Sequence, residues 1–338
     1  MKKVLSLLIC IVLLVSVASS AYAEWPDASR EFTLVAGYNP GGATDAICRT
    51  AAPFLEKYLG IPVVVQNIPG SGGLVGTNSV FAAKADGYTA IYTATTDGIW
   101  AYKYLSPTEV PWEISDWKST GVFASMQTMG FVCTKDKDWQ DFGDFIEYVR
   151  TQPEGSVTVA TLGPGRLDDL WAIELQEMLG VKFNWVLYEG SAAIQTDLLT
   201  GDIAAGCIGV ARDDFLDHPN FRVLLGLTDE YPEGCAYRGV YPTLLDFQER
   251  LGYKYEDLTS LSIPPVLSFI VKANIPDEAY EKLCEAIKQM CADPEYQEAM
   301  KKLSWPTYIS PEDAQETFDV IESTIASYVP LHKQYIAR

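Results

Sequence analysis

Residues 59–77 decide the fold, and they read L-G-I-P-V-V-V-Q-N-I-P-G-S-G-G-L-V-G-T. The apolar, β-branched run at 61–66 is typical of a strand buried on both faces, and Gly60 before it is suited to ending a helix. A glycine-rich loop at 67–73 follows, and the apolar residues after it predict a helix that continues to about residue 83. Helix end, strand, loop and helix start make up the repeating unit of a parallel α/β sheet.

The same unit occurs on both sides of this stretch. A strand at 32–36 leads through a loop at 38–42 into a helix that ends at Gly60, and a further strand follows at 88–95. This alternation of strands and helices predicts a doubly wound parallel sheet with helices on both faces.

A second α/β unit is predicted in the middle of the chain. Its strand-like runs are residues 122–133, 157–161, 183–188, 203–210 and 223–227, and its helices are 139–150, 167–179 and 191–199. Residues 231–255 are rich in Tyr, Pro and Gly and show no regular pattern. Helices return at 277–291, 294–303 and 311–329, so the chain reads as two α/β units with an all-helical C-terminal stretch.

The N-terminal segment has the pattern of a cleaved export signal. Two lysines precede the apolar run 4–17, which is shorter than the roughly 20 residues that span a bilayer. The small residues Ala21 and Ala23 then suit a cleavage site. We therefore expect residues 1–23 to be a signal peptide and the mature chain, from Glu24 onward, to be periplasmic.

The composition and the missing motifs exclude several classes of function. A formal net charge of −20 disfavours nucleic acids and anionic membranes as partners. The sequence lacks the P-loop, the dinucleotide fingerprint, C-x-x-C pairs, H-E-x-x-H and G-x-S-x-G, and its two histidines are His218 and His332. We therefore predict no cofactor and no metal. The cysteines after residue 23 are interpreted as small buried hydrophobes, with disulfide pairing left open.

Four glycine-rich loops, each between a strand and a helix, predict an anion-binding cleft. They lie at residues 38–42, 67–73, 163–166 and 190–191. Glycine lets the backbone approach a ligand closely, and the free N–H groups at a helix start attract negative charge. Loops at the carboxyl ends of strands are also where open α/β sheets bind ligands. Alternatively, the glycines only permit tight turns from strand to helix.

Several motifs of this sequence recur in one known family. They are Pro40-Gly41-Gly42 with Asp45 and Arg49, the run 59–77, the turn Asp86 to Thr89, the partly kept group Tyr188, Gly190, Asp197-Leu198 and Gly201-Asp202, and the stretch Pro276 to Tyr296. With these motifs the chain resembles the Bug or TctC family, the extracytoplasmic solute receptors of tripartite tricarboxylate transporters. The resemblance covers essentially the whole mature chain.

The resemblance implies an α/β type II periplasmic-binding-protein fold, with two α/β lobes and a ligand cleft between them. The first lobe is expected to hold residues 24–126 and 231–338, and the second lobe residues 127–230. The implied function is capture of a small organic carboxylate, a di- or tricarboxylate or a related acid, by a monomer that is not an enzyme. The receptor would deliver this acid to a membrane permease with a large and a small subunit.

In this family a ligand carboxylate is held largely by backbone amides and bridging waters from the glycine loops. Carried over to this sequence, the first-lobe ligand residues are Tyr38, Gly41, Gly42, Ala43, Thr44, Asp45, Ser71, Gly72, Gly73, Thr95 and Thr96. Those of the second lobe are Gly163, Gly165, Arg166, Tyr188, Ser191 and Asp197. For Asp45 and Asp197 we favour helix capping over contact with a ligand amine or hydroxyl.

Two positions depart from the family pattern. Arg166 stands where the family has a serine, and Glu189 stands where it has a lysine. Because a guanidinium can hold a carboxylate through two hydrogen bonds, Arg166 is predicted to bind the distal acid group of the ligand. A surface ion pair with Asp168 or Asp169 is equally compatible with the sequence.

Two other functions stay open at this point. A sensory receptor that presents its ligand to a membrane kinase would show the same sequence features. An exported enzyme would need a nucleophile or a base in the cleft, for which only Tyr188, Asp45 and Ser71 are available.

Overall fold

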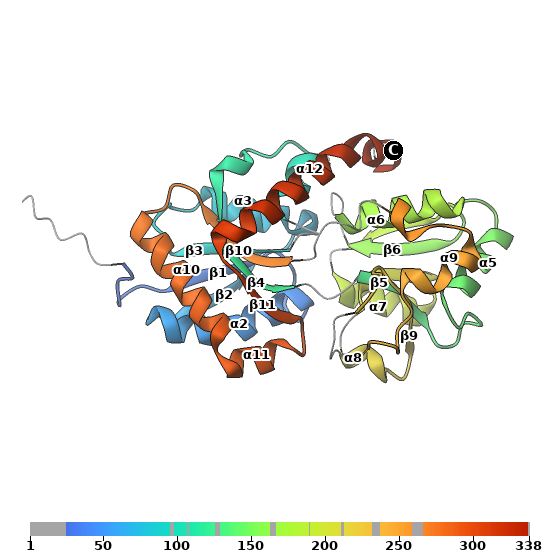
Figure 1. The fold of residues 1–338 in the computed structure, drawn as a ribbon, viewed down its shortest axis with the longest axis horizontal. Helices are drawn as coiled ribbons and strands as arrows, with labels where there is room; N and C mark the ends of the chain where they lie inside the picture. The colour runs from blue at the N-terminus through green and yellow to red at the C-terminus, as the bar shows by residue number, and fades with distance from the viewer. Residues whose placement is uncertain are drawn as a thin grey trace, which may run out of the picture.

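The computed structural model of this protein describes residues 25–94, 98–106, 108–125, 129–162, 167–188, 190–210, 213–231, 237–258 and 266–336. Two β-sheets, each flanked by helices, form two lobes that lie side by side (Figure 1). The predicted export signal lies outside the described residues. Among the residues that are described, no helix combines the length and the apolarity needed to cross a bilayer.

The first lobe is built on a six-stranded sheet with the strand order β11-β4-β10-β3-β1-β2. Its strands are β1 (Phe32–Ala36), β2 (Val63–Asn67), β3 (Thr89–Ala94), β4 (Trp117–Ser125), β10 (Val266–Lys272) and β11 (Trp305–Ile309). Its helices are α2 (Ala43–Leu59), α3 (Leu74–Ala82), α4 (Ile99–Leu105), α10 (Asp277–Ala292), α11 (Pro294–Met300) and α12 (Pro311–Ile336), with 3₁₀ turns at Ser71–Gly73 and Ile114–Asp116.

Of the five strand pairings in this sheet, two are parallel and three are antiparallel. Strand β1 pairs in parallel with both β2 and β3, as the alternating pattern predicted. Strand β10, however, runs antiparallel to β3 and β4, and β11 runs antiparallel to β4. The sequence pattern did not indicate these antiparallel pairings, because β10 enters the sheet only after the chain has passed through the second lobe. The expected parallel sheet is therefore a mixed one.

Apolar side chains cover both faces of the first sheet. Neighbouring residues of a strand point to opposite faces, and Leu34 and Val35 of β1 accordingly belong to separate apolar clusters. Leu34 shares its cluster with Leu55 of α2 and Ile287 of α10, whereas Val35 lies in the cluster of α3, α4 and α12. Among the described cysteines, Cys48, Cys133, Cys207 and Cys291 are buried and Cys284 is half-buried.

The second lobe is built on a five-stranded sheet with the strand order β7-β6-β8-β5-β9. Its strands are β5 (Met129–Thr134), β6 (Thr158–Leu162), β7 (Asn184–Tyr188), β8 (Ala205–Gly209) and β9 (Phe221–Gly226). Its helices are α5 (Phe142–Thr151), α6 (Leu167–Leu179), α7 (Ser191–Thr200), α8 (Asp213–Leu216) and α9 (Gln248–Leu251), with 3₁₀ turns at Leu244–Phe247 and Tyr255–Asp257. Strand β6 is parallel to β7 and β8, while β5 is antiparallel to β8 and β9.

The run 122–133, expected as one strand-like stretch, is divided between the two lobes. Strand β4 ends at Ser125 in the first sheet, and β5 begins at Met129 in the second. Both strands are largely buried, so the apolar pattern continues from one to the other and does not reveal where the chain crosses.

Residues 237–258 were expected in the first lobe, but their contacts lie in the second. Arg250 of α9 forms ion pairs of 3.0, 2.7 and 2.9 Å with three carboxylates on or just before α5: Asp141, Asp144 and Glu147. Figure 1 shows α9 beside α5 accordingly. These contacts favour a return of the chain to the first lobe between residues 258 and 266. Since the segment has no periodic pattern, its packing partner could not be inferred from the sequence.

Candidate functional site

The two glycine loops of the first lobe lie against each other at the carboxyl ends of β1 and β2. A Cβ atom on Gly37 would lie 2.9 Å from the Cα of Gly73, closer than real Cβ atoms approach a backbone. Gly73 itself has φ +103°, and a Cβ there would lie 2.4 Å from the hydroxyl of Tyr102. The close approach of the two loops therefore requires glycine at 37, whereas the left-handed backbone and the neighbouring Tyr102 hydroxyl require glycine at 73.

A buried carboxylate organises the first loop. Asp45, in the first turn of α2, accepts hydrogen bonds from the Gly41 amide and from Nε of Arg49, both at 2.9 Å. The Arg49 guanidinium also donates to Oδ1 of Asn67 at 3.0 Å. The side-chain nitrogen Nδ2 of Asn67 in turn donates to the Tyr38 carbonyl at 3.0 Å. This network ties the first loop to the end of β2, where the second loop begins.

The ionisation of Asp45 fits this structural role. Burial opposes the charged form, but hydrogen bonds from Arg49 and from the Gly41 amide outweigh it and hold the pKa of Asp45 below its ordinary value. The carboxylate is thus engaged by a loop amide and a helix side chain. It is not the cap of α2, because the helix begins at Ala43 and its N-cap, Gly42, has no side-chain hydrogen bond, so the expectation that Asp45 caps a helix was wrong.

The carbonyl of Gly72 fixes the second loop from the other side. It accepts hydrogen bonds from two tyrosine hydroxyls, at 2.5 Å from Tyr38 and at 2.7 Å from Tyr102 of α4. The hydroxyl of Tyr38, predicted as a ligand residue, is therefore used to hold the second loop. Tyr102 was not predicted at all, because nothing in its local sequence distinguishes it from a core residue.

The described glycine loops of this lobe offer backbone amides as hydrogen-bond donors to a ligand. Helix α2 follows Gly42, which has extended backbone angles and no side-chain cap, so the first-turn amides of Ala43 and Thr44 have no partner within the helix. Ser71 and Gly72 have positive φ values of 49° and 64°, a curled backbone of the kind that directs successive N–H groups at an anion. The Gly73 amide, by contrast, donates to the Gly70 carbonyl at 3.1 Å. Gly73 therefore serves loop geometry rather than donation.

The second lobe contributes side chains that bond to each other. Tyr188, the last residue of β7, donates from its hydroxyl to Oδ2 of Asp197 on α7 at 2.5 Å. This bond raises the pKa of Tyr188 to about 12. Asp197 lies in the second half of α7, so the expectation that it caps a helix was wrong. Ser191 is the first residue of α7 and follows Gly190.

The remaining predicted ligand residues cannot be placed in this geometry. Thr95, Thr96, Gly163, Gly165 and Arg166 lie outside the described residues, as does Glu189. They flank described strands, since β3 ends at Ala94 and β6 ends at Leu162.

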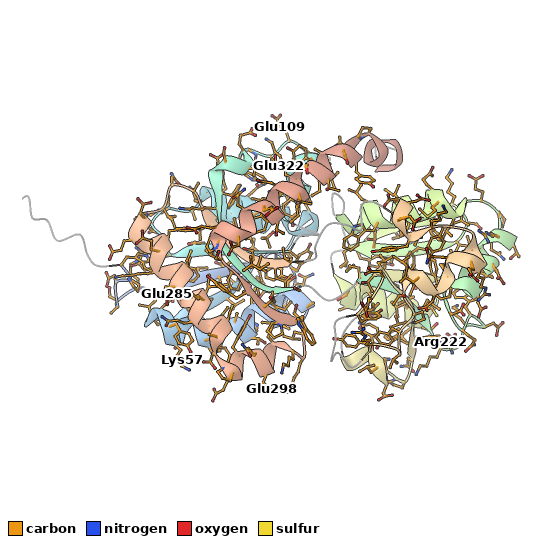
Figure 2. The ribbon with its side chains drawn as sticks, in the orientation of Figure 1. Lys57, Glu109, Arg222, Glu285, Glu298 and Glu322 are labelled. Atoms are coloured by element: carbon orange, nitrogen blue, oxygen red, sulfur yellow. The ribbon has the colours of Figure 1, made fainter. Side chains whose placement is uncertain are left out.

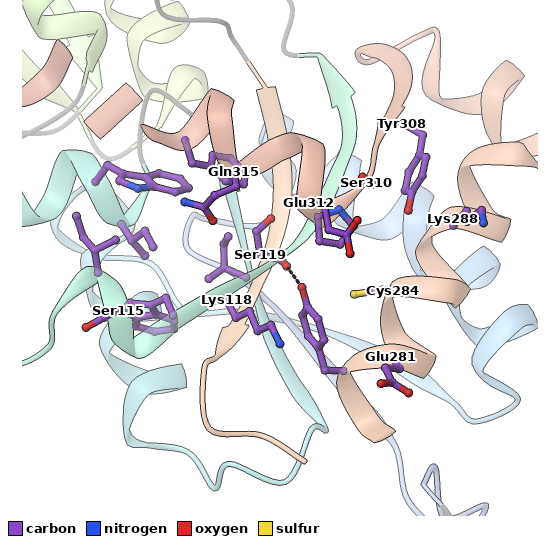
Figure 3. A pocket seen from close by; sticks show the side chains of 18 of the residues that line it. Ser115, Lys118, Ser119, Glu281, Cys284, Lys288, Tyr308, Ser310, Glu312 and Gln315 are labelled. Atoms are coloured by element: carbon purple, nitrogen blue, oxygen red, sulfur yellow. Dashed lines mark hydrogen bonds between the residues drawn. The ribbon is translucent and has the colours of Figure 1, made fainter. Parts of the chain in front are cut away.

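A pocket of about 820 Å³ lies elsewhere, at the edge of the first sheet between α10 and α12 (Figure 3). Its lining includes none of the predicted ligand residues. The ammonium of Lys118 lies 3.5 Å from the centre of the Tyr280 ring, and the Tyr280 hydroxyl donates to the Ser119 carbonyl at 2.7 Å. The charged residues of its lining are Glu281, Glu285, Glu312 and Glu322 against Lys118 and Lys288. This acidic excess makes the pocket unfavourable for an organic acid.

Comparison with solved structures defines the class of protein. An R. palustris protein described with adipate matches 92% of this chain and 97% of its own, with a TM-score of 0.76 and 23% identity. MatC from Rhodopseudomonas palustris, with bound malate, matches 88% of this chain and 99% of its own, with a TM-score of 0.69 and 19% identity. Together with a further match described as a periplasmic transporter (TM-score 0.78, 21% identity, covering 92% of this chain and 99% of that one), these show the two-lobed fold of periplasmic binding proteins.

Sequence comparison identifies the family. The profile described as "Tripartite tricarboxylate transporter family receptor" matches residues 47–335. A UPF0065 protein of Pseudomonas sp. (strain P51) is 29% identical over 86% of this chain and 82% of its own, and one of Agrobacterium vitis is 32% identical over 53% of this chain and 51% of its own. This chain belongs to the tripartite tricarboxylate transporter receptor family, and the resemblance noted from its motifs is confirmed.

Proposed function

We propose that this receptor captures a small organic di- or tricarboxylate, or a related acid, between its two lobes and delivers it to a membrane permease with a large and a small subunit. The observation that carries the proposal is the pair of interlocked glycine loops in the first lobe. The backbone N–H groups of Ala43 and Thr44 lie in the first turn of α2, and those of Ser71 and Gly72 lie in the turn before α3. Helix starts carry a positive electrostatic potential, so these N–H groups are suited to donate to an acid group.

Several observations support a carboxylate as the ligand. Backbone amides at helix starts recognise an acid group without a matching positive side chain. The net charge of −20 does not oppose this, because surface charges are screened beyond about 8–10 Å, whereas amides act at contact. Two structural neighbours, moreover, hold adipate and malate.

Two of the three reactive groups available to an exported enzyme, Tyr188 and Asp45, are engaged in structure. The pKa of Tyr188 is raised by its bond to Asp197, the opposite of what a nucleophilic tyrosine needs, and the Asp45 carboxylate is occupied by Gly41 and Arg49. This supports binding without catalysis. The predicted signal peptide at 1–23 supports a periplasmic receptor whose ligand comes from outside the cytoplasm, and we propose that this receptor acts as a monomer.

The test is thermal melting of the mature protein, refolded to remove retained ligand, against adipate, malate, citrate, monocarboxylates and amino acids. A ligand at a hundred times its Kd adds about 2.7 kcal/mol of stability and raises the Tm by several degrees. The dimethyl esters of the same acids are the matched control and should give no shift. A panel in which no acid raises the Tm, or in which esters do so equally, overturns the proposal.

Delivery to a permease needs a second measurement. Uptake of the acid found by melting is followed in cells that express the two permease subunits with and without this receptor. Uptake that does not depend on the receptor contradicts the delivery step while leaving acid capture intact.

A further inference from the structure

The C-terminal helix α12 connects the two lobes. It has 26 residues, which corresponds to about 39 Å of helix. Its first half packs within the first lobe, where the ring of Phe318 stacks on Trp100 with the ring centres 4.5 Å apart. The Tyr104 hydroxyl on α4 also donates to Oε1 of Glu322 at 2.7 Å, and Glu322 is labelled on this helix in Figure 2.

The second half of α12 reaches the second lobe, and Figure 1 shows the helix extending from the first lobe towards α6. There the Tyr328 hydroxyl donates to Oε1 of Glu174 on α6 at 2.7 Å. One turn earlier, Ile325 is fully buried in an apolar cluster that contains Leu170 and Trp171 of α6. Both side chains of the hydrogen bond are half-buried, so water screens it only in part.

The position of Glu174 gives this contact a consequence for binding. Helix α6 begins at Leu167, immediately after residues 163–166, which the sequence predicts as a ligand loop of the second lobe. Glu174 lies about two turns further along the same helix. A bond that holds α6 to α12 therefore sets how the described start of α6 is placed relative to the first lobe.

We propose that Tyr328 and Glu174 form an interlobe latch, a pair of positioning residues that favours the arrangement in which the two walls of the cleft face each other. The lobes are also joined by the chain itself, as between Ser125 of β4 and Met129 of β5, whereas the latch is a contact that opening must break. The effect on affinity rests on the proposed function, but the effect on lobe arrangement does not. Losing a hydrogen bond to a carboxylate should shift the balance of lobe arrangements about tenfold.

The chain offers a matched control for this bond. Tyr104 and Glu322 make the same tyrosine-to-carboxylate contact, at the same 2.7 Å and on the same helix, but both lie within the first lobe. Tyr328→Phe and Tyr104→Phe each remove one hydroxyl and nothing else. Glu174→Gln keeps an oxygen acceptor for Tyr328 and should retain most of the latch.

The experiment measures lobe arrangement and affinity separately. Small-angle X-ray scattering of the ligand-free mature protein should give a larger radius of gyration for Tyr328→Phe than for the wild type, Tyr104→Phe and Glu174→Gln. Calorimetric titration with adipate, and with any acid that raises the Tm, should show about tenfold weaker binding for Tyr328→Phe and less than twofold for Tyr104→Phe.

Scattering and affinity that are the same for Tyr328→Phe and Tyr104→Phe overturn the latch. If no acid binds even the wild type, the proposed function fails, while the scattering comparison still decides the latch.

Discussion

The two walls of the proposed ligand cleft are built in different ways. In the first lobe, Asp45, Arg49 and Asn67 hold the loops through a closed set of hydrogen bonds, and Gly37 and Gly73 let the two backbones touch. In the second lobe, the described part of the wall includes a pair of side chains, Tyr188 and Asp197, that are joined by one hydrogen bond.

This difference suggests that the two lobes have different roles in ligand binding. A preset array of backbone amides recognises any acid group, because amides carry little information about the rest of the ligand. Side chains that can exchange a partner for a ligand group discriminate between acids. Substitutions in the first lobe should therefore change affinity for all acids together, and substitutions in the second should change their order.

The largest effect is expected from Gly73→Ala. The new Cβ would meet the Tyr102 hydroxyl at 2.4 Å, and alanine is strained at a φ of +103°. We expect a loss of about 2–4 kcal/mol in the free energy of unfolding and at least a hundredfold loss of affinity for every acid bound. Urea unfolding and calorimetric titration measure the two quantities.

Gly209→Ala is the matched control for this change, because a Cβ there would meet nothing within 4 Å and the residue is not among the predicted ligand residues. Equal losses in both variants would show that glycine packing does not preset the loops.

Features that depend on neighbouring residues could be predicted from the sequence, whereas features that depend on residues far apart in the chain could not. Strand β1 and helix α6 have the predicted bounds, since apolar runs and flanking glycines are local signals. The entry of β10 between β3 and β4 and the packing of Arg250 on α5 depend on contacts between distant segments, so local patterns could not show them.

In the candidate site, too, contiguous residues were predicted and pairs of distant residues were not. The glycine loops were predicted because their residues are contiguous, and Asn67 lies within the quoted run although its bond to Tyr38 was not foreseen. Tyr102 acts on Gly72 across 30 residues and Tyr328 on Glu174 across 154, and no spacing rule reports such pairs.

A second, smaller effect is expected from Asp45→Asn. The folded pKa of Asp45 is lowered, so its ionised form stabilises the protein above the unfolded pKa of about 3.9, and this contribution is lost as the pH falls through the folded pKa. At pH 7 we expect a loss of about 1–2 kcal/mol and roughly tenfold weaker binding of all acids.

The stability difference between the wild type and Asp45→Asn should shrink as the pH is lowered below about 4, which urea unfolding across pH can follow. Asp86→Asn, at a partly exposed ion pair with Arg30, is the control and should change stability by less than about 0.5 kcal/mol. A pH-independent difference would contradict the role of the Asp45 charge.

Tyr188→Phe should alter selectivity more than stability. The hydroxyl bond to Asp197 is half-buried, so its loss should cost less than about 1 kcal/mol of unfolding free energy. It frees the Asp197 carboxylate, which then repels a ligand acid group nearby, so the order of affinities across the acid panel should change. Asp197→Asn keeps an acceptor for the tyrosine and removes the charge, and it should shift the order in the opposite sense. If both variants lowered the affinity for all acids by the same factor, this pair would not discriminate between acids and would act like the loops of the first lobe.

The smallest effects are expected from the two hydroxyls on Gly72. Tyr38→Phe or Tyr102→Phe alone leaves the buried Gly72 carbonyl with one donor, so each should cost under about 1 kcal/mol and weaken binding only two- to threefold. The double variant leaves the carbonyl without either donor, and an unsatisfied buried carbonyl costs more than the sum of the two single losses. A double-mutant cycle on affinity and unfolding free energy measures this coupling. If the two single losses add up exactly to the loss in the double variant, the hydroxyls do not act together in holding the second loop. The contrast between a preset first lobe and an adaptable second lobe would then depend on Asp45 and the glycines alone.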